Sequence, residues 1–202
     1  MYIPNYFQLD ESEVADFITN NNFATLISIG ADGVLVNYAP LLLDSKNNCL
    51  IGHLSNDNSH LQLMNDNQQI VVIFHGADGY VSPNWYKDKT QVPTWNFVKV
   101  EVKGRVNLIT SDGDKLVILE QLSNFHEHRI NSDWEMVKVP QDKLAAMLKA
   151  ITGFKINIES VKGKAKLSQN KSLAERSRVI EGLKSLQDSK SDALAKIMIE
   201  LT

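Results

Sequence analysis

The sequence lacks the features that mark several large classes of protein. Its single cysteine, Cys49, excludes an intrachain disulfide and fits a reducing compartment. Met1 to Asp10 contains neither the basic stretch nor the apolar run of a signal peptide, and no apolar stretch is long enough to cross a bilayer. A net charge of -3 argues against a basic nucleic-acid footprint over the whole protein. We therefore expect a cytoplasmic protein without membrane association, in which Cys49 is a small buried hydrophobic residue.

The motifs of the common catalytic classes are missing as well. The chain has no GxSxG, HExxH, CxxC, Walker or GxGxxG motif. His126 and His128 flank Glu127, but positions two apart on a helix do not share a face, so a helix C-terminus is favoured over a metal site. The sequence thus predicts no metal site and no evident catalytic constellation, and whether the protein is an enzyme stays open.

What the sequence does contain is a series of short strand-like segments. A chain of 202 residues with 43% hydrophobic residues can build a core without a disulfide or metal. Valines alternate with polar residues between Trp95 and Ile109, which predicts a half-buried strand with its valine face inward. The β-branched run in Gln69 to His75 predicts a strand buried on both faces, broken by Gly76-Ala77-Asp78-Gly79.

Helices are expected at the start and in the second half of the chain. Asp10 and Glu13 form a capping-box pattern, and Ser111 and Ser172 are further candidate caps. Helices are predicted over residues 11–20, 111–128, 142–150, 173–186 and 193–201. About six strands joined by tight turns predict an antiparallel barrel. We expect one domain, residues 1–202, mainly β with appended helices (α+β), with barrel strands at about 23–109 and 153–167, a helical insertion at about 111–150 and C-terminal helices at about 172–201.

A polar loop could hold a phosphate. His53 and His60 bracket Ser55-Asn56-Asp57-Asn58-Ser59, which follows a strand and opens a short helix. Hydroxyls, amides and free backbone N–H groups at a helix start suit an anion. The same residues would also make a well-capped turn, which is the favoured interpretation on the sequence alone.

Aromatic residues gather in two neighbouring segments, Tyr80 to Tyr86 and Val92 to Phe97. Aromatic rings mixed with Ser, Asn and Pro pack in a core, line a pocket or fill an interface. A planar ligand could stack there, or the rings could form a small aromatic core. The candidate pocket or interface residues are Tyr80, Ser82, Trp85 and Tyr86.

Lysines are concentrated near the end of the expected strands. Gly153 to Lys171 contains five lysines and one acid, Glu159. This local excess suits a phosphate or another anion, but lysines also protect the edge of a sheet from pairing. Both interpretations stay open at this point.

These segments together resemble the PaiB family of bacterial FMN-binding negative transcriptional regulators. The resemblance spans nearly the whole chain, and its most specific strings are Ser82-Pro83-Asn84-Trp85-Tyr86, Val92-Pro93-Thr94-Trp95-Asn96-Phe97 and Lys166-Leu167-Ser168-Gln169-Asn170. It implies a split β-barrel like that of the pyridoxine-phosphate oxidase flavoproteins, working as a homodimer with FMN in a cleft between subunits.

The resemblance also implies where FMN would be held. In the wider group the flavin ring lies along one barrel strand, and the phosphate is held after the next strand. The implied cofactor-binding residues are Tyr38, Ala39, Pro40, Leu41, His53, Leu54, Ser55, Asn58, Ser59, His60, Trp95, Asn96, Lys166, Ser168 and Gln169. Residues 53–65 contain no Arg or Lys, so the phosphate charge would be met by Lys166 or Lys171, or by the partner subunit.

Three functions follow as alternatives. The first is a PaiB-type repressor that responds to flavin or another ligand as a dimer and acts on DNA directly or indirectly, although no helix-turn-helix is evident. The second is a flavin-dependent small-molecule oxidoreductase, in which the flavin carries the redox chemistry. The third is an interaction protein without flavin.

Overall fold

The computed structural model describes residues 1–31, 33–64 and 67–200. Its strands form one seven-stranded antiparallel sheet in the order β2-β1-β5-β6-β7-β4-β3. In chain order the elements are η1 (Asn5–Phe7), α1 (Glu11–Asn20), β1 (Phe23–Gly30), β2 (Gly33–Pro40), β3 (Leu42–Asp44), β4 (Cys49–Ser55), η2 (Ser59–Gln62), β5 (Gln69–Val81), η3 (Pro83–Trp85), β6 (Thr94–Ile109), α2 (Asp112–Arg129), η4 (Met136–Lys138), α3 (Gln141–Lys149), β7 (Ile151–Lys166), α4 (Leu173–Ser185) and α5 (Ser189–Glu200). The expected class, mainly β with added helices and an antiparallel barrel-type sheet, is confirmed.

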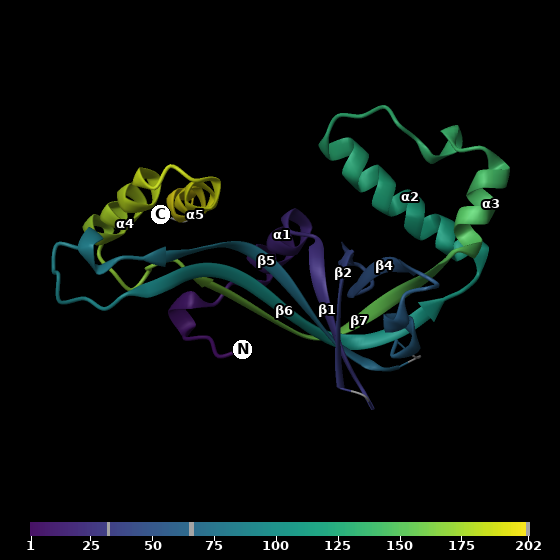
Figure 1. The fold of residues 1–202 in the computed structure, drawn as a ribbon, viewed down its shortest axis with the longest axis horizontal. Coiled ribbons are helices and arrows are strands. Elements are labelled where there is room, and N and C mark those ends of the chain that lie inside the picture. The colour runs from purple at the N-terminus through teal and green to yellow at the C-terminus, as the bar shows by residue number, and fades with distance from the viewer. Residues whose placement is uncertain (32, 65–66, 201–202) are drawn as a thin grey trace. The chain divides into compact units, whose positions relative to one another are not determined.

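The chain folds into two compact units, each assembled from separate segments (Figure 1). Unit 1 comprises residues 1–17, 75–101 and 162–202, and unit 2 comprises residues 18–74 and 102–161. The long strands β5, β6 and β7 each contribute one part to each unit. The expectation of a single domain over residues 1–202 stays a prediction.

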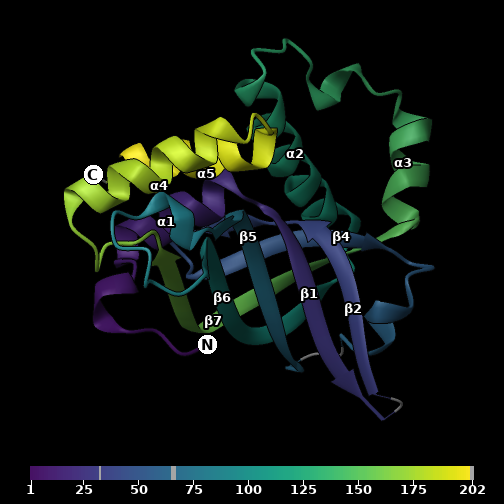
Figure 2. The ribbon, with the colours of Figure 1, turned by 60° about the vertical axis from the view of Figure 1, so that its left-hand side comes forward.

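Unit 2 is organised around the antiparallel pair β1 and β2, which lie side by side in Figure 2. Ala24, Leu26 and Ser28 of β1 are buried, while the alternate residues of the strand face outward, as the period of two requires. Directly opposite residues of an antiparallel pair share a face, so the outward residues of β1 and β2 form one surface.

One glycine of unit 2 is required by a close approach of two backbones. A Cβ on Gly104 of β6 would lie 2.3 Å from the carbonyl oxygen of Asn157 on β7. No side chain relaxes to remove a contact with a backbone oxygen, so β6 and β7 approach this closely only because residue 104 has no Cβ.

Unit 1 is built on the paired helices α4 and α5, which lie side by side near the C-terminus (Figure 1). Val179 and Leu183 of α4 and Leu194 and Met198 of α5 are fully buried. Gly182 of α4 rests on the ring of Trp85, and a Cβ there would come within 2.2 Å of the indole. The helix pair and the aromatic segment therefore share one packed core.

Several local predictions are confirmed. Asp10 and Glu13 form the capping box of α1, with their side chains accepting 2.8 Å hydrogen bonds from each other's backbone N–H. The hydroxyls of Ser111 and Ser172 cap α2 and α4. Cys49 is buried, and the alternating valines of β6 face inward.

Three predictions about the elements are wrong. The sheet has seven strands rather than about six. Gly76 to Gly79 does not break the strand, because β5 continues to Val81, and its first half alternates between buried and half-buried residues instead of being buried on both faces. The last helix starts at Ser189 rather than at residue 193, because the Asp188 side chain accepts backbone hydrogen bonds at its start. Leu201, where this helix was expected to end, lies outside the described residues.

Candidate functional site

The polar loop of unit 2 is held in place by amide side chains. The Asn58 carbonyl caps η2 by accepting the backbone N–H of His60 at 3.0 Å, and it accepts the side chain of Asn37 on β2 at 2.7 Å. The loop is thereby tied to the strand along which the flavin ring was expected. The capped turn predicted as one alternative is present, and it does not exclude a ligand.

Asn56 fixes the other end of the loop. Its backbone N–H donates to Ala150, its side-chain amide donates to the Lys149 carbonyl at 2.7 Å, and its carbonyl accepts the Thr152 hydroxyl at 2.8 Å. Asn56 thus joins the loop to the junction of α3 and β7. All these partners belong to unit 2, so the geometry of the loop is complete within that unit.

The two imidazoles that bracket this loop each carry a nitrogen atom with unmet hydrogen-bonding capacity. His60 is buried, and its Nε2 lies 2.9 Å from the hydroxyl of Ser28. The Nδ1 atoms of His53 and His60 are both buried without a hydrogen-bond partner within the described part of the chain. Burial lowers the pKa of His53 and of His60 below its ordinary value, which favours the neutral rings.

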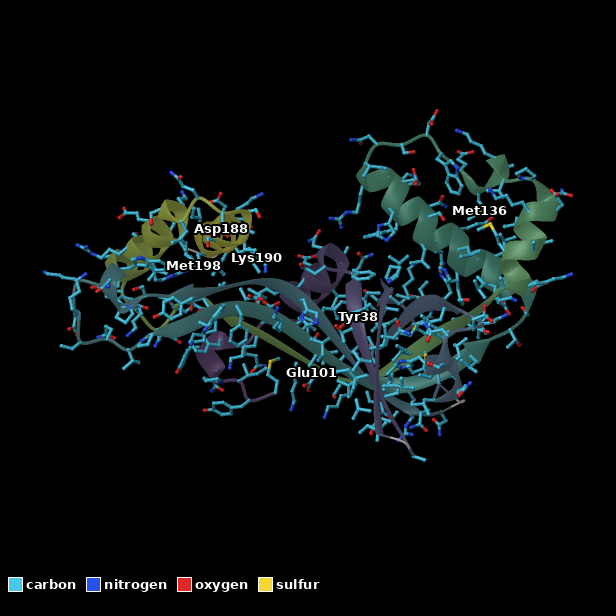
Figure 3. The ribbon with its side chains drawn as sticks, viewed as in Figure 1. Tyr38, Glu101, Met136, Asp188, Lys190 and Met198 are labelled. Atoms are coloured by element: carbon cyan, nitrogen blue, oxygen red, sulfur yellow. The ribbon has the colours of Figure 1, made fainter. Side chains whose placement is uncertain are left out.

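The other predicted residues of unit 2 differ in exposure. Tyr38 on β2 is 59% exposed, and its ring stacks on Phe23 with 6.4 Å between centroids (Figure 3). Ala39, Leu41 and Leu54 are buried. Pro40 is half-buried, and Ser55 and Ser59 are exposed.

Some of the predicted residues of unit 1, namely Tyr86, Asn96, Lys166 and Ser168, line a second feature, a pocket of about 170 Å³. Tyr86, Thr94, Asn96, Lys166, Ser168 and Lys171 contribute to its lining. The buried Asn96 amide donates to the Ser168 hydroxyl at 2.9 Å, and Ser168 adopts the left-handed conformation with φ 64°. Burial, assisted by the charge of Lys164, lowers the pKa of Lys166 below its ordinary value.

Some rings of the aromatic segment are buried, and others are exposed to solvent. Tyr86 is buried and Trp85 packs against Gly182, so these two belong to a small aromatic core. Trp95 is 55% exposed and meets the Tyr80 ring edge to face at 6.2 Å. The aromatic-core interpretation therefore holds for Trp85 and Tyr86, whereas stacking of a planar ligand on the exposed rings stays a prediction.

Two predicted polar residues of unit 1 use their side chains in hydrogen bonds to backbone groups close to them in sequence. The side chain of Gln169 pairs with backbone groups at the end of β7. It accepts the N–H of Leu167 at 2.7 Å and donates to the carbonyl of Ala165 at 2.6 Å. Ser82 caps η3 through the N–H of Asn84.

The structure gathers the predicted residues into two groups, one in each unit. Tyr38 to Leu41 and His53 to His60 lie in unit 2, whereas Trp95, Asn96 and the 166–169 segment lie in unit 1. Their assignment to FMN stays a prediction. The sequence did not lead us to Ser28, which contacts His60, or to Gln91, which contacts Lys171. For Ser28 a signal was present, because a serine at an inward position of an apolar strand indicates a buried polar partner nearby.

No cluster of three or more potential metal ligands occurs among residues 1–31, 33–64 and 67–200. Within the same ranges, no helix combines the length and apolar character needed to span a membrane.

Comparison with known proteins identifies the family. Residues 1–160 match the family described as "Putative FMN-binding domain". The Protease synthase and sporulation protein PAI 2 of Bacillus subtilis is 29% identical over 204 residues, which cover 98% of this chain and 96% of the relative. An uncharacterised protein of Saccharomyces cerevisiae is 29% identical over 155 residues, covering 64% of this chain and 92% of the yeast chain.

Solved structures show the same fold. The flavocytochrome Anf3 from Azotobacter vinelandii superposes with a TM-score of 0.62 at 18% identity, covering 81% of this chain and 72% of that one. The FAD and heme binding protein from Mycobacterium smegmatis gives a TM-score of 0.62 at 14% identity, covering 83% and 76%. The family match over most of the chain, with FMN as the implied cofactor, shows that this chain belongs to the PaiB family of FMN-binding proteins.

Proposed function

We propose that this protein is a PaiB-type negative transcriptional regulator that binds FMN through the polar loop of unit 2 and works as a flavin- or ligand-responsive homodimer. The observation that carries the flavin site is the pair of buried imidazole nitrogens, on His53 and His60, that have no partner among the described residues. They bracket the loop expected to hold the cofactor, His53 on β4 and His60 in η2, in a chain of an FMN-binding family.

The donors and acceptors of this loop fit a flavin. A buried polar atom without a partner costs about 1–3 kcal/mol, so a ligand that supplies the missing hydrogen bond is favoured there. A neutral imidazole nitrogen either donates or accepts, and the pyrimidine edge of a flavin offers both N–H and carbonyl groups. Ser28 fixes the ring of His60 through Nε2, which leaves Nδ1 for the ligand.

Tyr38 and Asn37 would form the strand side of this site. Tyr38 offers an exposed aromatic face, and Asn37 is already fixed by Asn58. Flavin supplies redox chemistry when bound, while the protein contributes binding and orientation. In our proposal the loop and β2 position the ring, and the neutral histidines hold its polar edge.

We propose that repression is indirect. A direct reader of DNA needs exposed cations on one element, yet Arg176 of α4 is buried and donates to the Met198 carbonyl. The exposed Arg178 shares its helix with Glu175 and Glu181. These charges favour indirect repression over a helix that reads DNA. In indirect repression, binding of the ligand would change how the protein interacts with a protein partner.

The dimer is proposed to form through the outward face of β1 and β2. Five large apolar side chains are exposed there: Phe23, Ile29, Val34, Val36 and Tyr38. Strand β2 is also an edge of the sheet. An exposed apolar surface on an edge strand favours association, and a second copy of the same face is complementary to it by symmetry.

The flavin proposal is tested by titrating the protein with FMN, following flavin absorbance and tryptophan fluorescence. We expect saturable binding, weakened about tenfold in His53→Leu, because the loss of one buried hydrogen bond to the ligand amounts to roughly that factor. His128→Leu, on an exposed position of α2, is the matched control and should bind as the wild type does. Absence of binding at saturating FMN, or equal binding by His53→Leu, would contradict the assignment.

A further inference from the structure

The pocket of unit 1 carries a positive charge that lies outside the proposed site of the flavin ring in unit 2. Two ammonium groups, Lys166 and Lys171, line it together with neutral polar residues, and no carboxylate is among its lining residues. None of the ion pairs found in the described ranges involves either lysine. The pocket therefore presents two positive charges without a counterion from its own walls.

Both ammonium groups are held in position by neutral neighbours. Lys166 donates to the hydroxyl of Thr94. Lys171 donates to the Gln91 carbonyl at 2.7 Å and lies 5.5 Å from the centre of the Tyr86 ring. Each ammonium has three donors and uses one of them in these contacts, so both retain donors for a ligand.

The acids nearby are occupied by other donors. Asp88 accepts hydrogen bonds from Thr90 and Gln91, and the Thr90 bonds are the main reason why its pKa is lowered to about 2. The Gln91 amide lies between this carboxylate and Lys171, donating to one and accepting from the other. Glu175 accepts the backbone N–H of Lys87. Asp88 is charged and attracts Lys171, but neither acid lines the pocket or forms an ion pair with its lysines, so the walls of the pocket stay cationic.

The floor of the pocket is rigid and polar. Asn96 is fully buried, Ser168 nearly so, and the two are hydrogen-bonded. Ser168 also holds a left-handed backbone conformation, and its carbonyl accepts the backbone N–H of Lys171, which closes the 168–171 turn beside the cavity. Such a preorganised floor suits a compact ligand with several oxygen acceptors.

The size of the pocket and its place in the fold separate it from the proposed site of the flavin ring. A volume of about 170 Å³ holds a small group rather than a tricyclic ring, since a cavity of about 150 Å³ is filled by one benzene. All lining residues belong to unit 1, and the polar loop belongs to unit 2.

We infer that this pocket is a second ligand site, which binds a small dianionic oxyanion of the phosphate or phosphate-monoester class independently of flavin. Two ammonium groups balance the two charges of such a ligand, and lysine acts on phosphate as a point charge. The inference goes beyond the proposed function and does not depend on it.

The test is a calorimetric titration of the full chain with inorganic phosphate at low ionic strength and about pH 8, where phosphate is mainly dianionic. The titration is done without flavin and again with saturating FMN. We compare the wild type with Lys166→Met/Lys171→Met and with Lys155→Met/Lys162→Met, a control that removes the same charge from exposed positions outside the pocket. Thermal melts verify that each variant is folded, and Lys171→Met alone replaces the double variant if it is not.

We expect saturable phosphate binding in both conditions, weakened at least about tenfold in the pocket variant and little changed in the control. Phosphate displaced by FMN but not by riboflavin would make the pocket the seat of the flavin phosphate and would overturn the inference. Absence of saturable binding, or equal loss in both double variants, would overturn it as well. Because phosphate is titrated without flavin, failure of the flavin proposal would leave this result unaffected.

Discussion

At the scale of single residues, the polar groups buried in the core are the most informative. Ser28 occupies an inward position of an otherwise apolar strand face, and its hydroxyl fixes one nitrogen of the buried His60 ring. This arrangement stabilises the neutral imidazole, because a protonated ring would be desolvated without a carboxylate partner. The stability of the protein is therefore coupled to pH through this side chain.

We expect the free energy of unfolding to fall as the pH drops below about 6.5, the ordinary pKa of histidine. Burial lowers the pKa of His60 in the folded protein, so the unfolded chain binds the proton more readily and is favoured at acidic pH. The contribution is fully present above the unfolded pKa. His60→Gln, which retains a polar side chain near Ser28, should reduce the pH dependence measured by urea denaturation at about pH 8 and about pH 5.5.

The remaining pH dependence has other sources, because burial also lowers the pKa of His53 and of His75. His128→Gln, at an exposed position, serves as the control. If His60→Gln and the wild type lost equal stability between the two pH values, the coupling assigned to His60 would be wrong.

At the scale of elements, the glycines of α2 and α4 should affect stability in opposite ways. Gly182 of α4 lies against the Trp85 indole, whereas a Cβ on Gly113, in the first turn of α2, would meet no atom within 4 Å beyond its chain neighbours and the helix's own backbone. Alanine is favoured over glycine in a helix by about 1 kcal/mol on propensity alone. Alanine substitution at Gly113 therefore measures helix propensity alone, whereas substitution at Gly182 also measures the cost of disturbed packing.

We expect Gly182→Ala to destabilise the protein by about 1–3 kcal/mol, because the added methyl overlaps the indole ring and must displace α4 or Trp85. Gly113→Ala should be neutral or stabilising. Thermal denaturation followed by tryptophan fluorescence measures both changes. Equal stability of the two variants would show that α4 does not pack on Trp85 as described.

The elements also show which parts of the fold and site the sequence could predict. Local signals with a direct physical effect, such as the Asp10–Glu13 capping box and the alternating valines of β6, predicted their elements correctly. The strand break predicted at Gly76 and Gly79 was wrong. These glycines stay in the strand, and because they have no Cβ, the side chains of Phe17 and Leu194 can pack against it. That role depends on packing between segments distant in sequence, which no local pattern contains.

The candidate site shows the same division. The loop with His53 and His60 could be identified from its polar residues and its place before a short helix. The hydrogen bonds of Asn56 to the α3–β7 junction, and the bridge of Gln91 between Asp88 and Lys171, join segments some 80 or more residues apart. Such pairs are set by the tertiary fold and could not be derived from a single sequence.

At the scale of the whole molecule, the outward face of β1 and β2 determines the proposed assembly. We expect Val36→Lys to convert a dimer into a monomer, because lysine at the centre of an edge-strand surface must be desolvated on association. Val137→Lys, at a position 83% exposed outside this face, is the control and should leave the mass unchanged. Light scattering coupled to size-exclusion chromatography measures both. A wild-type monomer at micromolar concentration, or an unchanged dimer of Val36→Lys, would contradict the assembly.

The division of the chain between the two units has a consequence for biosynthesis. Unit 2 is complete once residue 161 has been synthesised, whereas unit 1 needs residues 162–202, including the last part of β7 and both C-terminal helices. On the ribosome, the flavin loop can therefore fold before the segments that complete the cationic pocket have emerged. The nascent chain would reach FMN competence first and acquire the pocket only once residues 162–202 have been added.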